Sequence, residues 1–175
     1  MSLAAWNYLK LWPGLGALIG ASFLLLDFVP ARSQVRNYPE APDLGATARL
    51  ALIEIFRNRD ATAIDRFFSD PLVQHDPNLP DGIAGLKTFV AEVAKSPTSN
   101  ITIYRTLVDG DLVMLHSKYE NLPGFSGPVI AFDVFRFKNG RIVEHWGGQT
   151  PESGPNPSGH TQVDGPTTEI GRAHV

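Results

Sequence analysis

An aspartate on an apolar strand is the residue of this sequence best suited to chemistry. Asp133 lies within 129–137, a β-branched and aromatic segment in which alternate side chains share one face. It therefore shares a face with apolar neighbours such as Phe135. A carboxylate in such surroundings loses hydration, which favours its protonated form and lets it take and return a proton. The alternative is a structural ion pair with Arg105 or Arg136.

His116 is the expected partner of Asp133. It lies in the middle of 112–119, a segment that we expect to pair with 129–137. An imidazole beside a carboxylate can orient it, share its proton or stabilise a developing enolate. We therefore predict Asp133 and His116 as catalytic residues. The alternative for His116 is a buried histidine that is satisfied by a backbone carbonyl.

Other side chains are candidates for the wall of a pocket. His75 ends a short expected strand, 72–75, and Asp76 after it is a natural turn former. His145 and Trp146 are neighbours on the last strand, so they face opposite sides. We predict that Trp146 faces inward as a flat apolar wall and that His145 is structural or at a subunit contact. The predicted substrate-binding residues are His75, Trp146, Phe135, Tyr119 and Phe89.

The composition excludes several classes of site. The 175 residues include no cysteine, so disulfides, zinc–thiolate centres and thiol nucleophiles are excluded. A net charge of -3 gives no sign of nucleic-acid binding. Histidines and aspartates could ligate zinc or iron, but no pair has the tight helical spacing of a dedicated site. We therefore expect no metal site.

Three helices are expected in the first half of the chain. Apolar residues recur at helical spacing over 44–56, after Asp43 as the N-cap. Asp60 is a candidate cap for a short second helix that includes Phe67 and Phe68. Asp81 is a candidate cap for a third helix, whose apolar side runs from Ile83 to Ala94.

From Asn100 onward the pattern changes to a period of two, which is typical of strands. Asp109-Gly110 and Asn139-Gly140 are hairpin signals. The expected strands are 101–108, 112–119, 129–137 and 141–147. The order of elements predicts an α+β fold, with helices on one face of a bent antiparallel sheet, in a single domain over 44–150. Because both faces of 129–137 are apolar, we predict a homodimer through the outer sheet face.

The two ends of the chain are expected to lie outside this domain. Residues 1–31 combine Lys10, the apolar run Leu15 to Leu26 and Val29-Pro30-Ala31, which is typical of a signal peptide cleaved after Ala31. An uncleaved membrane anchor is the alternative, and both place the domain outside the cytoplasm, in the periplasm or beyond the cell.

Residues 151–175 form an irregular tail, rich in Pro and Gly. Its last six residues resemble a translated sequencing adapter. The natural sequence after about residue 169 is therefore not predicted.

Four segments carry a resemblance to a known family. They are Gln74-His75-Asp76-Pro77 with Pro80-Asp81-Gly82, His116-Ser117-Lys118-Tyr119, Phe132-Asp133-Val134-Phe135-Arg136 and Gly140-Arg141-Ile142-Val143-Glu144-His145-Trp146. In this order and spacing they resemble the SnoaL-like polyketide cyclase branch of the NTF2-like superfamily, particularly its bacterial group of predicted aldol-condensation enzymes. The resemblance covers about residues 44–150.

The resemblance implies a cone of three N-terminal helices on a strongly bent sheet. It also implies a general acid/base role for Asp133, aldol-type cyclisation or isomerisation of an apolar or aromatic carbonyl compound, and no cofactor. One alternative is a non-catalytic relative that binds an apolar small ligand, with Asp133 as a polar anchor. A third hypothesis is an interaction protein that works through the outer sheet face. Fold likeness alone does not choose between them.

Overall fold

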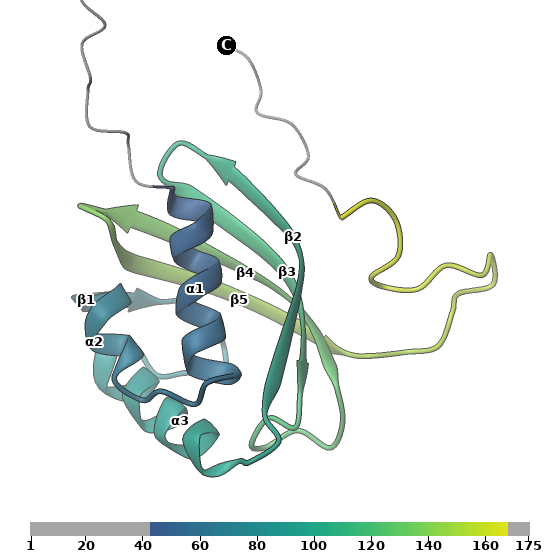
Figure 1. Cartoon of the computed structure of the whole chain (residues 1–175), viewed down its shortest axis with the longest axis horizontal. Coiled ribbons are helices and arrows are strands. Elements are labelled where there is room, and N and C mark those ends of the chain that lie inside the picture. Colours follow the sequence, from purple (N-terminus) through teal and green to yellow (C-terminus); the bar gives the residue numbers. More distant parts are fainter. Residues whose placement is uncertain (1–42, 168–175) are drawn as a thin grey trace, which may run out of the picture. The chain divides into compact units, whose positions relative to one another are not determined.

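The computed structural model describes residues 43–167, which form one body of three helices and five strands (Figure 1). The predicted signal peptide and the last eight residues lie outside the described part of the chain. Within residues 43–167, no helix is both long and apolar enough to cross a membrane. The elements are α1 (Leu44–Phe56), α2 (Ala63–Phe67), β1 (Phe68–Gln74), α3 (Ile83–Lys95), β2 (Asn100–Asp109), β3 (Leu112–Glu120), β4 (Val129–Lys138) and β5 (Arg141–Pro151).

Helix α1 forms where its spacing and its cap predict. The Asp43 carboxylate accepts a hydrogen bond from the Ala46 amide, 2.9 Å, which satisfies one free N–H of the first turn. The two other predicted caps are wrong. The α2 N-cap is Thr62, whose N–H and hydroxyl both donate to Asp60, and α3 begins after Gly82, in the left-handed region at φ 84°. Asp81 instead accepts a hydrogen bond from the Gln74 amide, 2.8 Å.

The strands form one sheet in the order β1-β5-β4-β3-β2. β1 runs parallel to β5, and the other neighbours are antiparallel. Figure 1 shows α1 and α3 on the same side of this curved sheet. The mixed α+β prediction is therefore confirmed, and the strand expected at 72–75 is β1, between α2 and α3. It begins earlier than expected, at Phe68, which was predicted in the helix.

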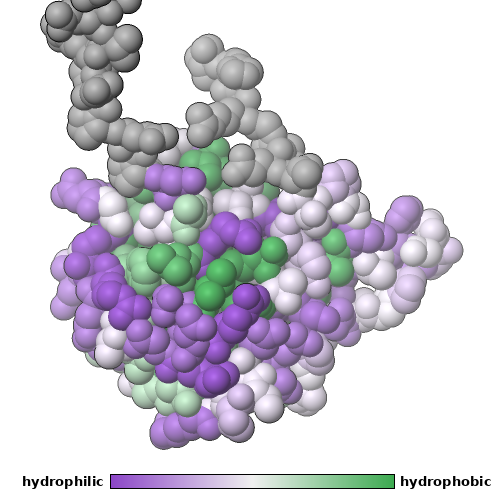
Figure 2. Space-filling view, viewed as in Figure 1, coloured by the Kyte–Doolittle hydropathy of each residue, from purple (hydrophilic) through white to green (hydrophobic). Residues whose placement is uncertain are grey.

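The face of the sheet that meets the helices carries the core. Ile55 of α1, Val90 of α3, Leu115 of β3 and Phe135 of β4 are almost fully buried there. On the opposite face Phe132 is 48% exposed. Figure 2 views the molecule from the side of α1, where hydrophobic residues gather across the middle within a hydrophilic rim. These two faces are called the inner and outer faces of the sheet below.

A bulge in β5 decides which side chains reach the inner face. The hairpin begins with the pairs Lys138–Arg141 and Phe137–Ile142, and then the register shifts. The next pairs are Arg136–Glu144 and Phe135–His145, so one residue of β5 is left over. Because a slip of one residue turns every later side chain to the other face, His145 faces inward and Trp146 outward.

The segment after β5 has no helix or strand but is held against the sheet. Arg105 of β2 donates hydrogen bonds to the backbone carbonyls of Val163, Asp164 and Pro166. Within this segment the Ser153 amide donates to the Gln162 side chain, 2.8 Å, and this hydrogen bond closes the loop between the two residues. Arg105 is therefore a clamp for the chain's own C-terminal segment.

Candidate functional site

A cavity of about 390 Å³ lies between the helices and the inner face of the sheet. This is within the usual range for sites that bind small molecules. Most of its lining is apolar, with a few polar groups at the sheet and at the turn after β1. The apolar lining comes from α1, α3, the loop 122–125 and β4, and includes Leu52, Phe56, Leu86, Phe89, Phe125 and Phe135.

Asp133 lies in this cavity and is 7% exposed. The Tyr119 hydroxyl donates to its Oδ2, 2.7 Å, and His145 Nε2 lies 3.3 Å from its Oδ1. Neither arginine considered as an alternative partner binds it, since Arg105 holds the C-terminal segment and Arg136 pairs with Glu144. The predicted location on an apolar inner face is therefore correct. Its catalytic role stays a prediction.

Tyr119 is a permanent donor to this carboxylate. Burial raises the pKa of its phenol well above the ordinary value, and the nearby Asp133 and Asp76 charges add to the effect. Its ring packs edge-on against Phe56, with centroids 4.7 Å apart, which fixes the direction of the hydroxyl. Asp133 Oδ2 is thus held in one position within the cavity.

The hydrogen bond at His145 Nδ1 shows which way the ring is oriented. The oxygen Oε1 of Gln74 accepts a hydrogen bond from the Asp76 amide, 2.9 Å, which identifies it as the amide oxygen. The same oxygen lies 2.9 Å from His145 Nδ1, so Nδ1 carries a proton and donates it. On the other side of the ring, Nε2 lies 3.3 Å from Asp133 Oδ1. A hydrogen bond between these two atoms needs one proton, which either group can carry, so the two side chains can act as an acid–base pair.

Asp76 is a second carboxylate in the cavity wall, 9% exposed. Its Oδ1 accepts hydrogen bonds from the Asn78 amide and side chain, as a turn-forming aspartate does. Its Oδ2 lies over Gly147, where a Cβ would overlap it. Gly147 pairs with Asp133 across β5 and β4, so the two carboxylates occupy neighbouring places on the inner face.

The predicted contact between His116 and Asp133 is wrong. In β3 it is Leu115, not His116, that pairs with Asp133. His116 pairs with Phe132 and stacks on its ring on the outer face, with centroids 4.4 Å apart. The Arg105 guanidinium donates to His116 Nδ1, 2.9 Å. Because adjacent residues of a strand face opposite ways, His116 cannot reach the cavity.

His116 gives a testable pH dependence of stability. Burial lowers the pKa of its imidazole, and the Arg105 charge lowers it further. The unfolded chain then takes up a proton before the folded one, so the stability from neutral His116 is complete above about pH 6.5 and is lost as the pH falls below it. We expect His116→Asn to reduce the fall in Tm between about pH 7.5 and 5.5. An unchanged pH dependence of thermal unfolding would contradict this assignment.

Trp146 and His75 also lie away from the cavity, contrary to prediction. Trp146 pairs with Val134 and stacks flat on the His75 ring, with centroids 4.9 Å apart. His75 Nε2 lies 2.9 Å from Glu144, which also accepts a hydrogen bond from Arg136. These side chains form a polar and aromatic cluster on the outer face.

Three predicted wall residues do line the cavity, namely Phe89, Tyr119 and Phe135. Four further residues of the site or its support were not predicted from the sequence, namely His145, Asp76, Gln74 and Gln149. The Gly147-Gly148 pair after Trp146 was the available signal, because a strand residue without a side chain marks a place where another group approaches closely. Among residues 43–167, no three His, Asp or Glu side chains are grouped so that they could hold a metal ion.

A cavity with a buried carboxylate, between the helices and one face of a sheet, defines a class of small mixed α+β proteins that bind their ligands in this place. The chain belongs to the SnoaL-like domain family, whose model matches residues 50–145. The resemblance to the SnoaL-like, NTF2-like group is thereby confirmed. No protein of curated function matches the sequence.

Solved structures share this fold at low sequence identity. A candidate polyketide cyclase from Acidithiobacillus ferrooxidans is 22% identical, with a TM-score of 0.51, over 64% of this chain and 91% of that one. An NTF2-like protein of unknown function from Cytophaga hutchinsonii is 10% identical, with a TM-score of 0.53, over 65% and 96%. AclR, a candidate hydroxylase from Streptomyces galilaeus, is 18% identical, with a TM-score of 0.52, over 61% and 78%. At these identities the likeness shows the fold.

Proposed function

We propose that this chain is a SnoaL-like enzyme that moves protons on a carbonyl compound, with Asp133 as the general acid/base. The observation that carries the proposal is the buried Asp133 in a mostly apolar cavity, held by hydrogen bonds to Tyr119 and His145. Buried carboxylates that have specific hydrogen-bonding or charged partners are typical of acid/base sites. The cavity volume suits a ligand of one or two rings.

The proposed reaction begins with a carbon acid next to a carbonyl group. Asp133 removes the proton, and the electron pair of the broken C–H bond moves into the carbonyl to give an enolate. In an aldol-type ring closure the enolate carbon bonds to a second carbonyl carbon, and Asp133 returns its proton to the new alkoxide. In an isomerisation the proton returns to another carbon. Between these steps Asp133 is a neutral carboxylic acid, and the negative charge lies on the enolate oxygen.

The test uses a small carbon acid, nitrobenzisoxazole, whose ring opens when a base removes its carbon-bound proton and the N–O bond breaks. The release of the coloured phenolate gives the rate directly. We expect the protein to accelerate this reaction well beyond acetate at equal concentration, and the acceleration to disappear in Asp133→Asn. Equal rates for the two proteins would refute the role of Asp133. That result would favour the alternative, a binding protein for an apolar ligand.

Export and self-association remain proposals. The signal peptide at 1–31 would be tested by measuring the mass of the mature protein after periplasmic expression.

The homodimer is proposed to form through the outer face, where Val134 and the exposed Phe132 lie on the same strand. A monomer in light scattering at high protein concentration would rule that dimer out.

A further inference from the structure

We infer that Asp76 is a ligand-binding carboxylate that selects uncharged, hydroxyl-bearing compounds and rejects those with a carboxylate. The inference deepens the proposed function, because it concerns the class of compound that enters the same cavity. It depends on the position, bonding and surroundings of Asp76, and on the glycine that makes room for it.

The position of Asp76 is fixed by its backbone. The His75 amide donates to the His145 carbonyl, 2.8 Å, and so extends the pairing of β1 with β5 by one residue. The Asp76 amide then donates to Gln74 Oε1, and its carbonyl accepts from the Leu79 amide, 3.1 Å. This turn delivers the carboxylate to the inner face opposite β5.

The two oxygens of Asp76 have different surroundings. Oδ1 accepts two hydrogen bonds from Asn78, at 2.8 and 3.1 Å. No hydrogen bond from residues 43–167 reaches Oδ2, which lies in the cavity wall above Gly147. Because Asp76 lines the cavity, a ligand donor that enters there can form a charge-assisted hydrogen bond with Oδ2. Oδ2 is therefore an acceptor that is available to the ligand.

Gly147 is the residue that makes this arrangement possible. A Cβ there would overlap Oδ2 and lie 2.9 Å from Cγ of Asp76, so any other residue would push the carboxylate away. Gly147 has no positive φ, and so its backbone conformation does not require glycine. The close approach of Asp76 is the physical reason for glycine at this position.

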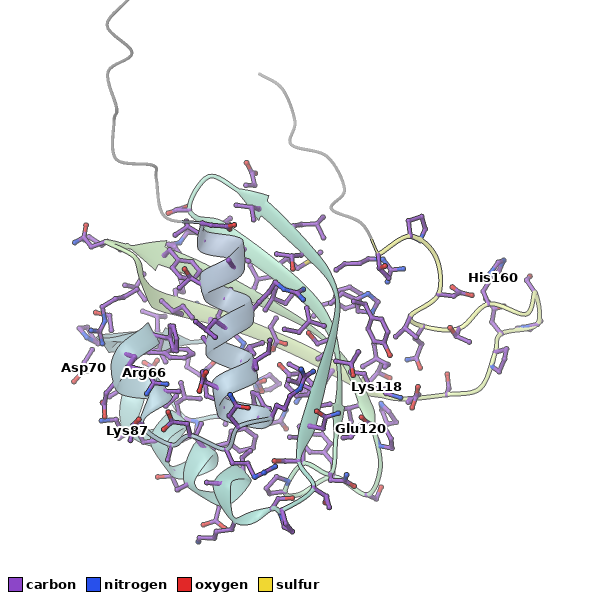
Figure 3. All side chains as sticks on the ribbon, viewed as in Figure 1. Arg66, Asp70, Lys87, Lys118, Glu120 and His160 are labelled. Carbon is purple, nitrogen blue, oxygen red and sulfur yellow. The ribbon has the colours of Figure 1, made fainter. Side chains whose placement is uncertain are left out.

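The charges of the wall set the class of ligand. Asp76 and Asp133 are its acids, His145 is its one titratable base, and the described lining includes neither lysine nor arginine. The basic residues of the helices lie outside, as Figure 3 shows for Arg66 and Lys87, whose side chains are both 46% exposed. Asp133 has His145 beside it, whereas no basic side chain of the described lining pairs with Asp76. A ligand carboxylate would therefore meet the uncompensated charge of Asp76, while a hydroxyl can donate to its Oδ2.

The experiment compares three matched probes by calorimetry or ligand-observed NMR, namely naphthol, methoxynaphthalene and naphthoate. They share one ring system and differ in offering a donor, an acceptor or a charge. We expect naphthol to bind at least about tenfold more tightly than the other two, because a hydrogen bond to a charged group is worth about that factor. Naphthoate binding as tightly as naphthol, or no detectable naphthol binding, would overturn the inference.

Asp76→Asn is the matched variant. Asparagine keeps Oδ1 for the Asn78 turn and replaces Oδ2 by an NH₂ donor, so thermal unfolding should change little. We expect naphthol to lose about tenfold in affinity and naphthoate to gain. If Asp76→Asn leaves the discrimination intact while Asp133→Asn removes it, Asp133 is the anchor and the inference fails.

Gly147→Ala provides a second route that leaves the charge in place. The added methyl group should displace the Asp76 carboxylate and weaken naphthol binding in the same direction as Asp76→Asn. In an Asp76→Gly background Gly147→Ala should have no further effect on binding, since Oδ2, Cγ and Cβ of Asp76, the three atoms nearest to the added methyl group, are all gone. An equal loss in both backgrounds would show that Gly147 acts independently of Asp76. The nitrobenzisoxazole rate of Asp133→Asn tests the proposed function separately from all these affinities.

Discussion

Asp133→Asn is expected to lower kcat/KM for nitrobenzisoxazole by at least about 100-fold, the lower end of what general acid–base catalysis contributes. Asparagine has nearly the same shape as aspartate but cannot take up the proton. The loss should therefore appear in kcat, with a smaller change in KM.

The same variant is expected to remain folded, for a reason given by the hydrogen bonds. In Asp133→Asn the new amide oxygen can still accept from Tyr119, and the new NH₂ group can donate to Nε2 of His145. All three side chains stay satisfied, so Tm should shift by only a few degrees. A variant that loses activity because it unfolds would contradict this account of the network.

His116→Asn is the matched control for this prediction. It removes a histidine of the neighbouring strand whose side chain lies on the outer face, 2.9 Å from the Arg105 guanidinium. The rate with nitrobenzisoxazole should remain within about twofold of the wild type, since no contact links His116 to the cavity. A loss as large as that of Asp133→Asn would show that His116 is needed for catalysis together with Asp133.

The fold could be predicted from the sequence because its signals are local. Period-two alternation and the turn pairs Asp109-Gly110 and Asn139-Gly140 located the hairpins, and helical spacing after Asp43 located α1. The same alternation placed Asp133 among apolar neighbours of one face. These patterns report which residues share a face, and they did so correctly.

The composition of the site could not be predicted in the same way, because it depends on one bulge. If the pairs Lys138–Arg141 and Phe137–Ile142 continued without interruption, Trp146 would lie opposite Asp133 and face the cavity. The bulge shifts the register by one, so Gly147 lies opposite Asp133 and His145 turns inward. Alternation shows that His145 and Trp146 face opposite sides, but only the register shows which side is inner.

Asp76 was predicted only as a turn former, because one side chain both forms the turn and lines the cavity. Its Oδ1 forms the turn that the sequence predicts, while its Oδ2 faces the cavity. A turn-forming aspartate looks the same in sequence whether its second oxygen meets water or a ligand. The distinguishing residue is Gly147, which is more than seventy positions away and becomes informative only when β1 and β5 are paired.

Phe135→Ala is expected to cost about 3–5 kcal/mol of unfolding free energy, the usual cost of truncating a buried phenylalanine. Phe135 is 1% exposed, packs edge-on against Phe68 with centroids 6.4 Å apart and stacks on His145. Truncation would remove these contacts and enlarge the cavity beside Asp133. Urea unfolding measures the change, and the milder Phe135→Leu should lie between the wild type and the alanine variant if the latter does not fold.

Phe132→Ala is the matched control, since the same residue type occupies the same strand three positions earlier. Phe132 is 48% exposed on the outer face and stacks only on His116 among the aromatic rings of residues 43–167. Its truncation should cost no more than about 1 kcal/mol in a monomer, as is usual for surface positions with one stacking contact. A larger cost that grows with protein concentration would indicate that a second subunit covers this face. Equal costs for the two phenylalanines in the monomer would instead mean that β4 presents the wrong face to the helices, and Asp133 would then lie outside the cavity.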